Sequence, residues 1–124
     1  MIEEYSLKLL CDKYGVLVIQ DFINGGSKYK FRVITVPALL PIKYDDTKYK
    51  AFGRLDEQGR EFYKKESENI IDVLYNHPSV VVYTVFNEAW GQFDSKKMTE
   101  YFKGLDSTRL YDSTSGWHDT KSGN

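Results

Sequence analysis

Polar and aromatic side chains that could bind or protonate a substrate follow three apolar runs of the sequence. The runs are Val16–Gln20, Val80–Phe86 and Arg109–Asp112. The side chains that follow them are Asp21, Asn87, Glu88, Trp90, Trp117 and His118. A carboxyl can exchange a proton, an amide can hydrogen-bond a hydroxyl, and an indole can stack on a flat apolar face. The pattern indicates a binding or catalytic site, with Glu88 emerging where a substrate would sit.

Each of these residues also has a purely structural interpretation. The alternatives are a helix cap for Glu88, a turn for Asn87, a loop acid for Asp21, core packing for Trp90 and Trp117, and a solvated loop for His118. No His/Cys pair has metal-ligand spacing, and neither a GxGxxG pattern nor a P-loop is present. The sequence therefore predicts no metal and no cofactor.

The elements that must position these residues alternate between helix and strand. Helices are predicted over Ile2–Tyr14, over Asp56–Tyr75, and from Asp94 or Ser95 onward. With the three apolar runs as strands, the order is α-β-loop-α-β-α-β, which is typical of an α/β fold with parallel strands. Ligands of such sheets bind at the carboxyl ends of the strands, so the polar strand ends are expected to meet on one edge.

Two helices have an apolar face at helical spacing. Phe62, Ile70, Val73 and Leu74 supply it in the helix over Asp56–Tyr75. Met98, Tyr101, Phe102 and Leu105 supply it in the last helix. We expect both sets to pack against the sheet.

Residues 22–55 show no clean period. They contain Gly25-Gly26, Pro37 and Pro41, and only Val33–Val36 suggests a scrap of strand. We expect a long irregular loop with little regular structure, and such loops in compact domains are usually functional or disordered.

Composition limits the class of protein. The 124 residues suffice for one small core, and 41% hydrophobic content is ordinary for a globular chain. Seventeen basic and 18 acidic residues give a net charge of −1, so nucleic acid is a poor candidate partner. No signal peptide and no apolar run of about 18 residues is seen, so no membrane partner and a cytoplasmic location are expected.

Residues 74–88, LYNHPSVVVYTVFNE, closely resemble the acid/base signature of glycoside hydrolase family 2, which includes β-galactosidases, β-glucuronidases and β-mannosidases. The chain departs from the pattern at Tyr75, where a basic residue is usual, and at Tyr83-Thr84, where Trp and a small residue are usual. Cys11–Asp21 is similar to the family's third barrel strand and the helix before it. Asp106–Asp112 with Ser115-Gly116-Trp117 is similar to its fifth strand and loop.

The resemblance implies a retaining β-glycosidase on a (β/α)₈ barrel. By it, Glu88 is the general acid/base and Asn87 hydrogen-bonds the sugar 2-hydroxyl. The remaining pocket residues that it implies are Asp21, Trp90, Trp117 and His118.

A retaining enzyme also needs a nucleophilic carboxylate, which this family carries at the end of its seventh strand. Only the third to fifth strand regions are recognised here. We therefore expect residues 1–124 to be a fragment of the catalytic barrel that is inactive alone, with an exposed sheet that favours a homo-oligomer. One alternative is a non-catalytic α/β module that binds sugar or a protein partner. A weaker one is another clan of (β/α)₈ glycosidase.

Overall fold

A computed structural model of the chain describes residues 2–28, 30–40, 42–87, 89, 91–116 and 118–124. Helices and strands alternate as predicted, with two additional helices after the first strand. In chain order the elements are α1 (Ile2–Tyr14), β1 (Val18–Asp21), α2 (Arg32–Leu39), α3 (Tyr49–Phe52), α4 (Glu57–Leu74), β2 (Val80–Phe86), α5 (Ser95–Leu105) and β3 (Leu110–Thr114).

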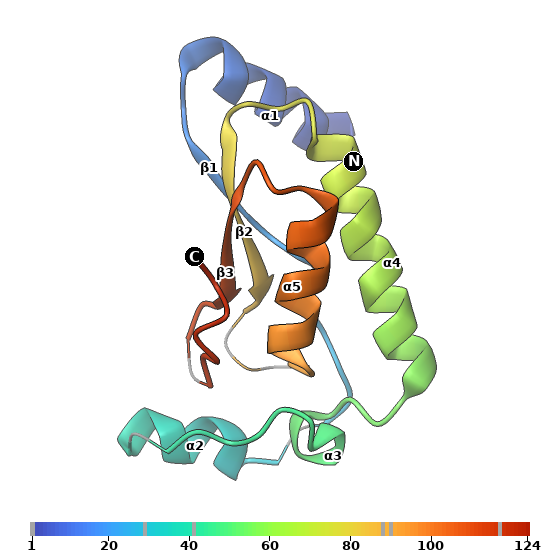
Figure 1. Ribbon diagram of the computed structural model, residues 1–124, viewed down its shortest axis with the longest axis vertical. Coiled ribbons are helices and arrows are strands. Elements are labelled where there is room, and N and C mark those ends of the chain that lie inside the picture. The colour runs from blue at the N-terminus through green and yellow to red at the C-terminus, as the bar shows by residue number, and fades with distance from the viewer. Residues whose placement is uncertain (1, 29, 41, 88, 90, 117) are drawn as a thin grey trace.

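The three described strands form one parallel sheet in the order β1-β2-β3. Helices α4 and α5 lie side by side next to this sheet, and α5 contacts both β2 and β3 (Figure 1). Parallel strands joined by helices are the repeating unit of a (β/α)₈ barrel. The predicted fold class, a partial barrel of about three parallel strands, is confirmed.

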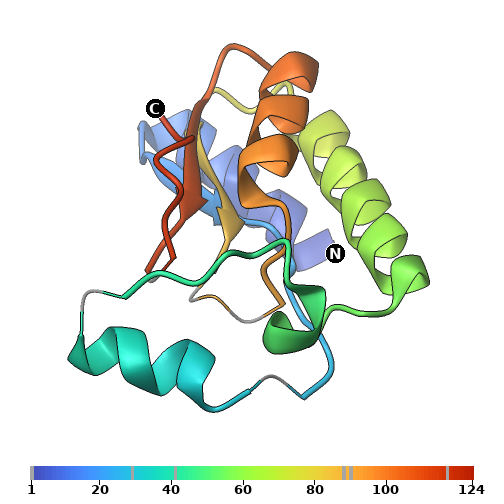
Figure 2. The same cartoon turned by 60° about the horizontal axis from the view of Figure 1, so that its bottom comes forward.

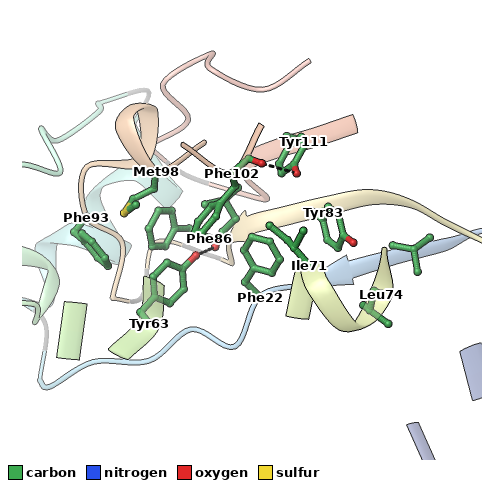
Figure 3. Close-up of a cluster of buried hydrophobic side chains, with 12 residues drawn as sticks. Phe22, Tyr63, Ile71, Leu74, Tyr83, Phe86, Phe93, Met98, Phe102 and Tyr111 are labelled. Carbon is green, nitrogen blue, oxygen red and sulfur yellow. Dashed lines mark hydrogen bonds between the residues drawn. The ribbon is translucent and has the colours of Figure 1, made fainter. Parts of the chain in front are cut away.

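The main core lies between the sheet and the helices α4 and α5 (Figure 3). On α4 the buried residues are Tyr63, Ser67, Ile71 and Leu74. The Tyr63 hydroxyl donates a hydrogen bond to the backbone oxygen of Val85 in β2. Aromatic rings from α4, from α5 and from the chain after β1 complete the cluster. The ring of Phe22, after β1, is in edge contact with the ring of Phe102 in α5, at 5.0 Å between centroids.

The predicted apolar stripe of α4 was partly wrong. Phe62 and Val73 are 66% and 58% exposed. Each precedes a buried residue, Tyr63 or Leu74, and consecutive helical residues are rotated by about 100°. The error is smaller on α5, where Met98 and Phe102 are buried as predicted while Tyr101 and Leu105 are exposed.

Residues 22–55 contain two helices, so the expectation of little regular structure was wrong for 32–39 and 49–52. Val33–Val36 belongs to α2 and not to a strand. The physical reason is a second core cluster: Val33 and Phe52 are buried against Ala89, which follows β2. Figure 2 shows α2 and α3 lying across the end of the sheet where the strands finish.

The limits of β1 and β3 differ from the predicted ones by one or two residues at each end, whereas β2 has the predicted limits. β1 begins at Val18, where pairing with Val80 of β2 begins, and β3 continues to Thr114 because Thr114 pairs with Phe86. Cross-strand hydrogen bonding, rather than local β propensity, fixes these limits. Within the described residues, none of the helices has the length and apolarity that a bilayer crossing demands.

Candidate active site

The carboxyl ends of the three described strands lie on one edge of the sheet, with β1 ending two residues short of β2. Asp21 of β1 pairs with Thr84 of β2, and Thr84 pairs with Asp112 of β3. Paired residues of parallel strands point to the same face. Asp21 and Asp112 therefore flank Thr84 on one edge, in strand order, as predicted; Glu88, the third carboxyl of that prediction, lies outside the described residues.

Asn87 is the first residue after β2, and its side chain is exposed. Its Oδ1 accepts a hydrogen bond of 2.6 Å from the Ser115 hydroxyl. The Ser115 backbone N–H also donates to the Phe86 oxygen at 3.0 Å. The ends of β2 and β3 are thus joined at Asn87. Trp90 and Trp117 lie outside the described residues, so their predicted contacts stay predictions.

Three glycines from separate segments meet beside the turn that follows Asn87; we call Gly26, Gly53 and Gly91 the glycine cluster. Gly53 and Gly91 have positive φ, 72° and 68°. A Cβ on Gly91 would lie 2.3 Å from the Gly25 oxygen, and one on Gly26 would lie 2.9 Å from the Gly53 oxygen. The backbones can approach this closely only because these positions lack side chains.

Arg54 ties the same turn to the segment after β1. It is 6% exposed, and its Nε donates to the Gly91 oxygen at 2.9 Å. Its Nη2 donates to Asn24 Oδ1 at 3.3 Å. The guanidinium lies 5.6 Å and 5.5 Å from the ring centroids of Tyr63 and Phe93. Burial lowers the pKa of Arg54, and an arginine remains protonated in such a setting.

Asp46 performs the capping that the sequence assigned to Asp94 or Ser95. Asp94 occupies the N-cap position of α5 but makes no side-chain cap bond. The Asp46 carboxylate, 7% exposed, instead accepts from the Ser95 backbone N–H at 3.0 Å and from Gln92 Nε2 at 2.8 Å. A cap from 49 residues away therefore fixes the start of α5 after the candidate site.

His118 is buried, so the expectation of a solvated loop was wrong. It is 3% exposed and its two ring nitrogens face backbone groups of Tyr44 and Val33. Its backbone oxygen accepts from Gln92 Nε2 at 3.2 Å. The His118 imidazole thus holds the segment after β1. The predicted contact of His118 with substrate stays a prediction. Asp21, by contrast, is exposed at the end of β1.

Sequence inspection missed the residues that tie these segments together. Those residues are Asn24, Asp46, Arg54, Gln92 and the glycine cluster. The pair Gly25-Gly26 in an otherwise aromatic and basic stretch was a visible signal of close backbone approach. A buried arginine or aspartate leaves no comparable signal, because its partner is distant in sequence.

A pocket of about 740 Å³ opens along β3. Its lining includes Asp112, Thr114, Ser115 and Asp119, so it reaches the residue that holds Asn87. The Thr114 hydroxyl is buried without a hydrogen-bond partner among the described residues. Hydroxyl and carboxylate groups of this kind can hydrogen-bond a polar ligand. No group of three or more potential metal ligands forms within the described residues.

Comparison with protein families gives a match over nearly the whole chain. The family described as glycosyl hydrolases family 2, TIM barrel domain, matches residues 3–122. A search of curated proteins found no similar sequence. The match extends over the three parallel strands and over the strand end that bears Asn87 and Glu88. This chain therefore belongs to the TIM barrel domain family of the family 2 glycosyl hydrolases.

Proposed function

We propose that these 124 residues carry the acid/base half of the active site of a retaining β-glycosidase, with Glu88 as the general acid/base. The observation that carries the proposal is the position of Asn87. It stands exposed at the carboxyl end of β2, immediately before Glu88, in a chain of the matching family. Carboxyl ends of barrel strands are where TIM-barrel enzymes hold their catalytic groups.

The geometry at Asn87 suits contact with a sugar hydroxyl. Ser115 donates to its Oδ1, which orients the amide group. The amide nitrogen carries two N–H groups, which are the donors that this side chain can offer to a ligand. A donor at this place can bond the 2-hydroxyl, an interaction that strengthens in the transition state of glycoside cleavage.

The proposed chemistry has two proton transfers at Glu88. As an acid it protonates the glycosidic oxygen as the bond to the anomeric carbon breaks. As a base it later takes a proton from the water that attacks the glycosyl intermediate. Asp21, Trp90 and Trp117 contribute to the pocket, with the exposed carboxylate of Asp21 as a hydrogen-bond acceptor for sugar hydroxyls.

The nucleophile comes from outside this set of strands. Asp21 and Asp112 are both level with Thr84, which is two residues before the end of β2. Two residues of strand span about 7 Å, so both carboxylates stand back from the strand end that bears Glu88. A retaining site requires its two carboxyls about 5–5.5 Å apart on opposite sides of the scissile bond. Neither aspartate is suited to that role.

The test is an assay of the 124-residue chain with aryl β-galactoside, β-glucuronide and β-mannoside, beside Glu88→Gln. We expect no turnover from either protein, since acid catalysis alone supplies about 10²–10⁴-fold. In a second arm, Glu88→Gln is placed in a longer polypeptide that completes the barrel. It should lose activity on alkyl glycosides, whose leaving groups need a proton, and retain far more on dinitrophenyl glycosides.

Two results would contradict the proposal. Hydrolysis by the 124 residues that disappears in Glu88→Gln would mean that a nucleophile lies within them. Equal losses on alkyl and dinitrophenyl glycosides in the second arm would mean that Glu88 does not protonate the leaving group.

A further inference from the structure

His118 fastens the segment that crosses the carboxyl edge of the sheet. We call residues 30–40 and 42–46 the crossing segment; it contains α2 (Figure 2). The Tyr44 backbone N–H donates to His118 Nδ1 at 2.9 Å, and His118 Nε2 lies 2.6 Å from the Val33 oxygen. The two bonds span 74 and 85 residues of sequence. One imidazole therefore holds the segment at two points.

Pro37 explains why the Val33 oxygen is available. In an α-helix the backbone N–H of residue i donates to the oxygen of residue i−4, and proline has no N–H. Pro37 lies inside α2, so Val33 receives no such bond from it. His118 Nε2 supplies the missing donor. The carbonyl that lacks a helical donor and the ring nitrogen that donates to it are therefore hydrogen-bond partners.

The two bonds require a neutral imidazole. Nδ1 accepts a hydrogen bond from the Tyr44 backbone N–H, so Nδ1 carries no proton, and the ring proton stands on Nε2, which donates a hydrogen bond to the Val33 oxygen. A second proton would have to stand on Nδ1, directly facing the Tyr44 N–H. Two donors would then oppose each other in a site where the ring is 3% exposed and water cannot intervene.

The imidazole nitrogens bond backbone groups only, and among the described residues no carboxylate hydrogen-bonds them. The rings of Tyr44 and Phe52 pack against the imidazole at 5.6 Å and 5.3 Å between centroids. The nearby charged groups are engaged elsewhere: Lys43 Nζ with the Asp119 oxygen, Asp119 with Ser113 and the Lys121 N–H, and Asp46 with Gln92 and Ser95. Among the described residues His118 forms no ion pair. A protonated His118 would therefore lack a hydrogen-bonded counterion among the described residues.

We propose that His118 is a pH-sensitive latch: neutral, it holds the crossing segment over the carboxyl edge of the sheet, and protonated, it releases Tyr44 and Val33. Release would uncover the strand ends without opening the core between α4, α5 and the sheet, because the ring contacts of His118 are with Tyr44 and Phe52 of the second cluster. The inference concerns the fold itself and does not depend on glycosidase chemistry.

The test is NMR of the ¹⁵N-labelled chain between about pH 8 and about pH 5, the range in which histidines change charge. Long-range ¹H–¹⁵N spectra should show His118 as the Nε2–H tautomer at the upper end. As its ring titrates, the protection factor of the Tyr44 amide should fall on the order of tenfold. Amides of α4 should keep theirs.

The chain offers a matched control, because it has two histidines, His77 and His118. His118→Asn places an amide oxygen near the Nδ1 position and does not titrate, so Tyr44 protection should become independent of pH. His77→Asn should leave the Tyr44 response unchanged. The ring signals, assigned with these variants, report titration in wild type even where a variant folds poorly.

Three outcomes would overturn the latch. The first is protonation of His118 with no loss of protection at Tyr44. The second is a response of Tyr44 that persists in His118→Asn. The third is a His118 ring that stays neutral until the whole chain unfolds.

Discussion

The two edges of the sheet are built differently. At the amino edge, where the strands begin, Asp12 of α1 contacts His77 and Ser79 just before β2. At the carboxyl edge, segments after all three strands interlock through the glycine cluster, Arg54 and His118. At the amino edge, hydrogen bonds connect two short polar segments. At the carboxyl edge, the backbones of several loops pack closely and are connected by buried hydrogen bonds.

The difference follows what each edge must do. In TIM barrels the amino face contributes stability, and the carboxyl face holds the site. A few hydrogen bonds suffice to dock α1, but a site needs its turns held in one geometry. Here close backbone packing and buried charged groups supply that, so substitutions at the carboxyl edge should cost more than comparable ones at the amino edge.

The largest contrast is expected between glycines. Gly91→Ala should lower the free energy of unfolding by about 3 kcal/mol or more, because its Cβ would meet the Gly25 oxygen at 2.3 Å and its φ is 68°. Gly15, between α1 and β1, has φ 69° and nothing within 4 Å of an added Cβ. Gly15→Ala should therefore cost only the conformational part, about 1–2 kcal/mol. Urea unfolding measures the free energy of unfolding of both variants. Equal decreases in Gly91→Ala and Gly15→Ala would contradict the distinction between the two edges.

An intermediate effect is expected at Arg54. Arg54→Met keeps the length of the side chain but removes the bonds to the Gly91 oxygen and Asn24, at a cost of about 2–3 kcal/mol. Arg54→Lys should recover little, because one ammonium cannot reproduce the planar fork of donors between two aromatic rings. Full stability in Arg54→Lys would mean that charge alone matters there. The denaturant midpoints of the two variants and of wild type decide whether the charge suffices or the planar set of donors is required.

The smallest effect is expected at Asp12 and depends on pH. Hydrogen bonds from Ser79, and then from His77, hold the pKa of Asp12 below its ordinary value. A depressed folded pKa stabilises the fold above the unfolded pKa, near 3.9, and this is lost as pH falls through the folded value. Asp12→Asn should thus be less stable than wild type at neutral pH, and the difference should vanish in acid. A constant difference across thermal melts at several pH values would show that the carboxylate charge is unimportant.

The alternation of elements was readable from the sequence because it depends on local patterns. β2 was predicted at its observed limits, Val80–Phe86, since a run of β-branched and aromatic residues ends there in a polar pair. α1 was predicted over the observed Ile2–Tyr14, and α4 differs by one residue at each end. From this alternation the parallel sheet follows, because short helical crossovers leave few other arrangements.

The site was only partly readable, since the sequence locates strand ends but not the partners of their loops. Asp21 and Asn87 were placed on one edge by alternation alone. The two helices of residues 22–55 could not be predicted, because Val33 and Phe52 are buried in a cluster with Ala89, which is distant in sequence. Nor could the burial of Arg54 and His118, whose partners lie on other segments.

The sequence by itself therefore determined the alternation of α1, α4 and α5 with the three strands, the parallel sheet and the polar pair that follows β2. Only the tertiary structure decided how residues 22–55 cross the carboxyl edge and what fixes the turn after Asn87. The physical reason is the range of the interactions. Periodicity and capping act over a few residues and leave a pattern in the chain, whereas close backbone contact and buried hydrogen bonds join residues tens of positions apart.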